Sequence, residues 1–162
     1  MRVNQGALGR LLLITVMGCG PASTKPATPP PASGKRVWAV LPAESDAYPI
    51  AARAATERMR RARVRGMEEP QFSKVSLEVV QLSIECTDKS AACYEAVGRS
   101  LAANQLLFTE IDDGPKKKSI RVTVTLFDVD AKQRKKAAIK VFATEEDVVW
   151  GVADVIAEAT KP

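Results

Sequence analysis

The segment Ser119–Val129, SIRVTVTLFDV, alternates residue by residue between two kinds of side chain. The apolar set is Ile120, Val122, Val124 and Leu126. The set between them is mostly polar: Arg121, Thr123, Thr125 and Phe127. A period of two is typical of a β-strand with one face in the core. The segment therefore predicts a strand whose other face is mostly polar.

Apolar runs on both sides of this segment predict four more strands. Three precede it, at Val37–Leu41, Ser76–Ile84 and Gln105–Ile111, and one follows it at Lys136–Ala143. Short polar connections join the last three strands, which favours an antiparallel meander. The first three strands are separated by longer segments and are expected to run parallel.

Three helices are predicted between and after these strands. The first runs from Ser45 or Asp46 to about Val64, and the second from Asp88 or Ser90 to about Asn104. The third follows Thr144-Glu145-Glu146-Asp147, which resembles a capping box and precedes an apolar stripe at helical spacing. The predicted order is β-α-β-α-β-β-β-α. We therefore expect an α/β fold, with a single mixed five-stranded sheet covered by three helices.

Length and composition allow one folded domain and exclude several kinds of catalysis. The chain has 162 residues, of which 46% are hydrophobic and 27% charged, and it contains no histidine. Without an imidazole, neither Ser-His-Asp nor Cys-His nucleophile activation can operate. The sequence also has no phosphate-cradling glycine loop, and its aspartates do not match the spacing of an EF-hand. We expect no catalytic residues, no cofactor and no metal site.

The N-terminus has the parts of an export signal in the usual order. Two arginines accompany the apolar run Leu11–Met17, which is too short to span a bilayer. The tetrad Val16-Met17-Gly18-Cys19 resembles the lipobox of bacterial lipoproteins, although Met17 departs from the usual Ala or Ser. That resemblance implies a signal peptide at 1–18 and a lipidated Cys19. The alternative is a buried amphipathic first helix with an incidental cysteine.

Residues 19–35 are rich in proline and small residues and contain no aromatic side chain. Such a composition predicts a semi-extended tether, which could hold the domain at 36–162 up to about 50 Å from a membrane. Gly20 follows Cys19 in place of the Asp associated with inner-membrane retention in enteric bacteria. The resemblance to lipoproteins therefore implies an outer-membrane protein that faces the periplasm. Removal of 1–18 lowers the formal net charge from +5 to +3, because two arginines leave with it.

Cys86 and Cys93 are the two thiols that remain once Cys19 is lipidated. An even pair in an oxidising compartment favours a disulfide, which would contribute about 2.5 kcal/mol by closing a short loop. The alternatives are free buried thiols, a redox-active pair or metal ligands. Redox pairs usually have two residues between them, and two cysteines without histidine make a poor zinc site.

Two basic clusters are candidates for a contact surface. One is Arg58, Arg60, Arg61, Arg63 and Arg65 at the end of the first predicted helix, and the other is Lys116, Lys117 and Lys118 beside a turn. Each could contact anionic lipid headgroups, lipopolysaccharide or an acidic partner. The alternative for both is an ordinary solvated surface, since cations suit the C-terminal end of a helix. Nucleic acid is disfavoured because the export signal places the protein outside the cytoplasm.

The strand ending at Pro42, the cysteine pair and the segment Val97–Leu107 (VGRSLAANQLL) together resemble a known family. They are similar to the TolB N-terminal-like superfamily, which includes CsgG-like and LpoB-like envelope lipoprotein domains. The likeness covers about 36–160, although Asn104 stands where an acidic residue is more usual. It implies a role in protein binding or assembly, without catalysis. No functional motif matches residue by residue, so no binding residues are transferred.

Two functions remain open from the sequence. The first is a lipid-anchored periplasmic protein-binding domain that acts as an accessory or regulator of an envelope complex. The second is a structural or assembly subunit of an oligomeric envelope or secretion complex. In both cases the expected partners are an envelope protein and, through the N-terminal lipid, the membrane.

Overall fold

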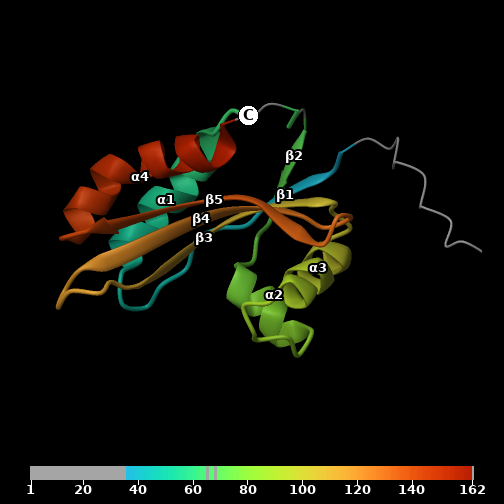
Figure 1. Ribbon diagram of the computed structural model, residues 1–162, viewed down its shortest axis with the longest axis horizontal. Coiled ribbons are helices and arrows are strands. Elements are labelled where there is room, and N and C mark those ends of the chain that lie inside the picture. The colour runs from blue at the N-terminus through green and yellow to red at the C-terminus, as the bar shows by residue number, and fades with distance from the viewer. Residues whose placement is uncertain (1–35, 65, 68, 162) are drawn as a thin grey trace, which may run out of the picture. The chain divides into compact units, whose positions relative to one another are not determined.

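A mixed five-stranded sheet lies between two pairs of helices in the computed structural model, which describes residues 36–64, 66–67 and 69–161 (Figure 1). The strands are β1 (Trp38–Val40), β2 (Pro70–Phe72), β3 (Gln105–Asp113), β4 (Ile120–Asp128) and β5 (Gln133–Phe142). Their order across the sheet is β2-β1-β3-β4-β5. β1 is parallel to both neighbours, and β3, β4 and β5 form an antiparallel meander. The predicted α/β class with one mixed five-stranded sheet is confirmed.

Helices α1 (Pro49–Arg61) and α4 (Glu145–Thr160) cover one face of this sheet (Figure 1). The main core lies between them and the strands, and it contains the apolar β4 side chains that the alternation predicts to be buried. Thr144 and Asp147 form the expected capping box at the start of α4. The Glu145 carboxylate accepts hydrogen bonds from the backbone N–H groups of Ile50 and Ala51, both at 2.9 Å. The first turn of α4 therefore also caps the first turn of α1.

Helices α2 (Leu77–Ser83) and α3 (Ala91–Ser100) cover part of the opposite face. Figure 1 shows both of them beneath one end of the sheet. A second core cluster fills this side, with Tyr94 at its centre. The Tyr94 ring centroid lies 4.9 Å from that of Phe108 and 5.5 Å from that of Phe127. Aromatic packing thus holds α3 on β3 and β4.

The strand predicted at 76–84 is wrong, because this segment forms helix α2. The Ser76 hydroxyl accepts a hydrogen bond from the Val79 backbone N–H at 3.4 Å, which is the position of a helix N-cap. Its buried residues Leu77, Val80 and Gln81 recur at helical spacing. The second strand is instead the three-residue edge strand β2, and the described part of the chain has four helices in place of the predicted three.

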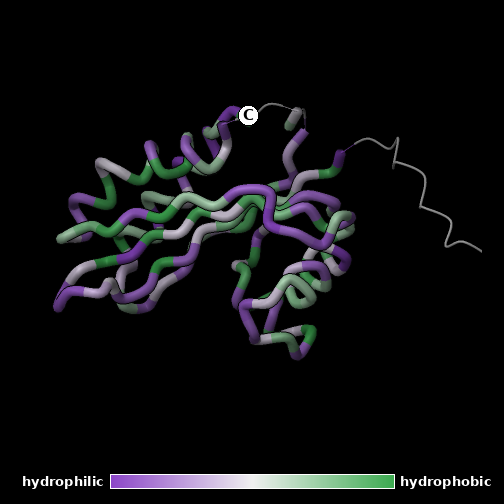
Figure 2. The backbone as a smooth tube through the Cα atoms, in the orientation of Figure 1, coloured by the Kyte–Doolittle hydropathy of each residue, from purple (hydrophilic) through white to green (hydrophobic). Residues whose placement is uncertain are grey.

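The edge strand β5 differs in hydropathy from the strand beside it. In Figure 2 the first part of β5, which begins Gln133-Arg134-Lys135-Lys136, is hydrophilic, whereas the sequence of its neighbour β4 is more apolar. Among the described residues, no helix combines the length and apolar character needed to cross a bilayer. The predicted signal peptide at 1–18, the tether at 19–35 and the lipidation site Cys19 lie outside the described residues.

Candidate functional site

The last turns of α1 and α4 end side by side, beside the start of β5. The two helices run in the same direction, because Glu145 joins their N-terminal turns and Arg61 and Ala157 line one hollow near their other ends. The strand register places Lys136 opposite Leu126, in this same region. Four segments of the chain therefore meet at this end of the main core: the two helix ends, β1 and the start of β5.

Two adjoining hollows open here, and we call them together the basic groove. The first has a volume of about 420 Å³ and lies between the helices; its lining includes Arg58, Arg61, Arg63, Ala153, Ile156 and Ala157. The second has a volume of about 510 Å³ and lies toward the sheet; its lining includes Arg36, Trp38, Val64, Leu126, Lys135 and Lys136. Thr160 and Lys161 line both hollows, so the two hollows adjoin each other.

The described lining of the basic groove is strongly cationic. It contains seven cations and no carboxylate: Arg36, Arg58, Arg61, Arg63, Lys135, Lys136 and Lys161. The negative ends of two helix dipoles amount to about one elementary charge together. Seven cations therefore exceed what the helix ends require.

Among the residues that the structure describes, few partners neutralise these cations. Lys135 pairs with Asp128 at 3.4 Å, and the Lys136 ammonium donates to the Lys161 carbonyl at 3.0 Å. Arg36, Arg58, Arg61, Arg63 and Lys161 have no ion pair among the described residues, and all five are exposed. The groove therefore offers positive charge to a ligand.

Apolar side chains form the floor beneath these cations. Trp38 and Ile156 are 2% and 3% exposed, so both are fixed by the core. The Trp38 indole N–H donates to the Gly66 carbonyl at 3.1 Å, which fixes the orientation of the ring. A cationic rim over a rigid apolar floor suits a ligand that is both anionic and partly apolar.

In the structure, the two predicted basic clusters lie in different places. Arg58 and Arg61 line the groove, and Arg65 lies outside the described residues. Lys116, Lys117 and Lys118 lie in the turn between β3 and β4. That turn precedes Ile120, which is six residues along β4 from Leu126 in the groove lining, or about 20 Å away along the strand. The lysine turn and the groove are therefore separate surfaces.

The sequence does not predict that four of the seven groove cations lie beside the arginines of the first helix: Arg36, Lys135, Lys136 and Lys161. They come from the start of the domain, from β5 and from the residue after α4. The sequence does predict that Lys135 and Lys136 lie far from the lysine turn, because successive connections of a meander lie at opposite ends of the sheet. The proximity of these two lysines to α1 depends on how the helices pack, which spacing does not reveal.

Cys86 and Cys93 are joined by a disulfide in the structure, with their Cα atoms 5.6 Å apart. The bond connects the segment after α2 to the first turn of α3, whereas the sequence placed it between a strand and a helix. Within the described ranges, the two sulfurs and the Asp88 carboxylate lie close enough together to be considered as metal ligands. Sulfurs bonded to each other are not thiolate ligands, so this cluster does not favour a metal site.

We predict that the double variant Cys86→Ser/Cys93→Ser unfolds more easily than the wild type, by about 2.5 kcal/mol, because the loop between α2 and α3 is no longer closed. Urea unfolding followed by circular dichroism measures this difference. In the native protein, both cysteines should resist a thiol-labelling reagent until reductant is added. Rapid labelling of both without reductant would contradict the disulfide.

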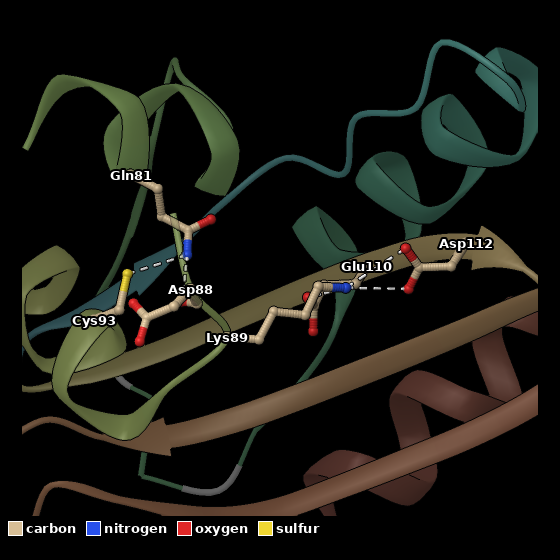
Figure 3. A network of polar contacts seen from close by, with 6 residues as sticks. All are labelled: Gln81, Asp88, Lys89, Cys93, Glu110 and Asp112. Atoms are coloured by element: carbon tan, nitrogen blue, oxygen red, sulfur yellow. Dashed lines mark hydrogen bonds and ion pairs between the residues drawn. The ribbon is translucent and has the colours of Figure 1, made fainter. Parts of the chain in front are cut away.

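Lys89 forms the centre of a polar network beside the disulfide (Figure 3). Its ammonium lies 3.0 Å from the Glu110 carboxylate and 3.3 Å from that of Asp112. Partial burial opposes the charged form of Lys89, but its contacts with Glu110 and Asp112 outweigh that effect and raise its pKa. The network attaches the loop before α3 to β3, and its charges are paired within the protein. We therefore assign it a structural role.

Comparisons with known proteins give no family for this chain. No protein-family model matches it, and no curated protein matches it. Solved structures give distant likenesses. The LpoB C-terminal domain from Salmonella enterica is 12% identical, with 67% of this chain and 82% of that chain covered and a TM-score of 0.43.

Two other solved structures are similarly distant. The NMR structure of E. coli LpoB is 14% identical, covers 83% of this chain and 82% of that chain, and has a TM-score of 0.43. A PelC dodecamer from Paraburkholderia phytofirmans is 15% identical, with 80% of this chain and 90% of that chain covered and a TM-score of 0.41. These values do not assign the chain to a family, and the resemblance to the TolB N-terminal-like superfamily stays a prediction.

Proposed function

We propose that this chain is a lipid-anchored docking domain of the periplasm, which acts as an accessory or regulator of an envelope complex. The basic groove is the observation that supports this proposal best, because it is a concave surface with unpaired charge and an apolar floor. Arg36 lines the groove and directly follows the predicted tether at 19–35. The proposed docking surface thus begins where the tether joins the fold.

The tether would make weak docking sufficient. A tether confines the domain to a layer within about 50 Å of the membrane, which raises its local concentration near a membrane-bound partner above that of a freely diffusing domain. Charge contacts at an exposed rim, each of modest strength, can then give stable occupancy. In this mechanism the tether sets the search radius and the groove supplies the contact.

The groove chemistry favours binding over catalysis. Its described lining contains no carboxylate, cysteine or histidine that could act as a base or a nucleophile. Arginine and lysine remain charged at neutral pH, and they bind and orient anions. We therefore propose a non-catalytic role.

The second candidate function is an assembly subunit, and one observation favours it. The edge strand β5 exposes Ile139 and Val141, which are 62% and 43% exposed. However, the same strand carries Arg134, Lys135, Lys136 and Lys140, and lysines along an edge oppose pairing between two copies. The docking role is therefore the stronger candidate.

Photo-crosslinking in the envelope of the source cell tests the docking role. A photoreactive amino acid at the exposed groove residue Ala157 should give a crosslink to one envelope protein, identified by mass spectrometry. The matched control is Ala91, an exposed alanine of α3 on the opposite face of the sheet. Equal products at both positions, or none at either, would contradict the proposal.

A further inference from the structure

We infer that the basic groove binds an acidic segment of the partner protein, and that this segment carries apolar side chains which contact the groove floor. The inference rests on the proposed docking function and specifies the chemistry of the partner. It depends on three features of the described residues: unpaired cations, an apolar floor and a concave shape.

The charge argument favours another molecule over the N-terminal part of this chain. Residues 1–35 contain no aspartate or glutamate, so this segment cannot neutralise the groove. Five groove cations have no ion pair among the described residues, as shown above. Carboxylates that approach Arg58, Arg61 and Lys161 would therefore gain attraction without displacing an existing partner.

A second copy of this chain could not dock through the acids at the start of α4 without a loss of stability. These acids lie at the end of the helix pair opposite the groove. Glu145 already accepts two hydrogen bonds from α1, and Asp147 already accepts two from Thr144, one from its backbone N–H and one from its hydroxyl. Using them in a contact between copies would remove the caps of both helices, at a cost to helix stability.

The shape of the groove favours a polypeptide segment over a membrane surface. A bilayer is flat and could contact only the cationic rim, whereas the apolar floor lies within hollows of about 420 and 510 Å³. Trp38 and Ile156 line these hollows and are almost fully buried, so a flat surface would not contact them. A segment that alternates acidic and apolar side chains can contact the rim and the floor together.

The test uses the mature full-length lipoprotein in detergent and three probes. The first is a synthetic peptide that alternates glutamate with leucine and tryptophan, and the second is the same peptide with glutamine in place of glutamate. The third is a soluble short-chain phosphatidylglycerol. Binding is measured by fluorescence anisotropy or calorimetry at low and high salt. The glutamate peptide should bind the wild type at least about tenfold more tightly than the glutamine peptide, and salt should weaken its binding.

Two charge-matched variants locate the site. The groove variant Arg58→Glu/Arg61→Glu/Lys161→Glu should reduce affinity for the glutamate peptide by about tenfold or more. The control variant Lys116→Glu/Lys117→Glu/Lys118→Glu changes the net charge equally at the separate lysine turn, and should alter affinity by less than about threefold. Circular dichroism and the unfolding midpoint verify folding. If the groove variant does not fold, the single change Ala157→Glu, at an exposed groove position, should weaken peptide binding in the same direction.

Several outcomes overturn the inference. An equal loss of affinity for the glutamate peptide in both triple variants would show a non-specific charge effect. Equal binding of the glutamate and glutamine peptides would show that the groove does not recognise carboxylates. Groove-dependent binding of phosphatidylglycerol without peptide binding would assign the groove to lipid. Self-association that the groove variant abolishes would assign it to a second copy.

A different outcome would refute the docking function itself. If the Ala157 photoprobe in cells captures a partner but the glutamate peptide does not bind, docking stands and the acidic segment is wrong. If the glutamate peptide binds but the Ala157 photoprobe captures no protein, the proposed function is wrong.

Discussion

Replacement of Cys19 with serine is expected to abolish acylation and to release the protein from the membrane. The lipobox resemblance at 16–19 predicts that the Cys19 thiol is the attachment point of the lipid. If this lipid is the membrane attachment, Cys19→Ser should leave the membrane fraction after a high-salt wash, whereas the wild type should stay in it.

Metabolic labelling with palmitate and membrane fractionation measure this change. The double variant Cys86→Ser/Cys93→Ser is the control, because it removes the other two cysteines and leaves Cys19 in place. The control should incorporate palmitate at the wild-type level, whereas Cys19→Ser should incorporate none. A Cys19→Ser protein that remains fully membrane-bound would refute the lipidation and, with it, the anchored part of the proposed function.

The second large effect is expected at Gly98, where α3 packs against Val129, the residue that follows β4. A Cβ atom at Gly98 would lie 2.2 Å from one methyl carbon of Val129 and 2.9 Å from the other. Val129 is fully buried, and its backbone N–H donates to the Asn104 carbonyl at 3.0 Å, so it cannot move aside easily. We expect Gly98→Val to lower the free energy of unfolding by about 3 kcal/mol or more.

A double-mutant cycle tests the cause of that loss. Val129→Ala removes the two clashing methyl groups, so Gly98→Ala should be much less damaging in the Val129→Ala protein than in the wild type. Urea unfolding of the four proteins gives the coupling energy. Purely additive effects, or a Gly98→Val protein as stable as the wild type, would show that α3 does not approach Val129 in this way.

The sequence predicts best the elements that have a long periodic pattern. The alternation through β4 and the capping box before α4 both identify their elements correctly, because each pattern extends over many residues or includes a specific cap. Helix α2 has only seven residues, and its apolar side chains fit a strand as well as a helix. Its conformation depends on the Ser76 cap and on packing against α3, and a short window contains neither signal clearly.

The groove could be predicted only in part. Arg58 and Arg61 are visible in the sequence as the basic end of one helix. Arg36 and Lys136 belong to the same groove only because α1 and α4 run in the same direction and β5 starts near the C-terminal ends of both helices. Those are long-range relations, between segments up to about a hundred residues apart, and local spacing does not encode them. The sequence therefore indicates a basic cluster but does not reveal its full extent or its apolar floor.

The central claim is that the basic groove is where a partner docks, and crosslinking at Ala157 in the cell tests it most directly. The measurement compares the yield of the Ala157 crosslink in the wild type, in the groove variant and in the charge-matched lysine-turn variant. We predict that the groove variant loses the crosslinked partner while the lysine-turn variant retains it. The same yield in all three proteins would contradict the claim.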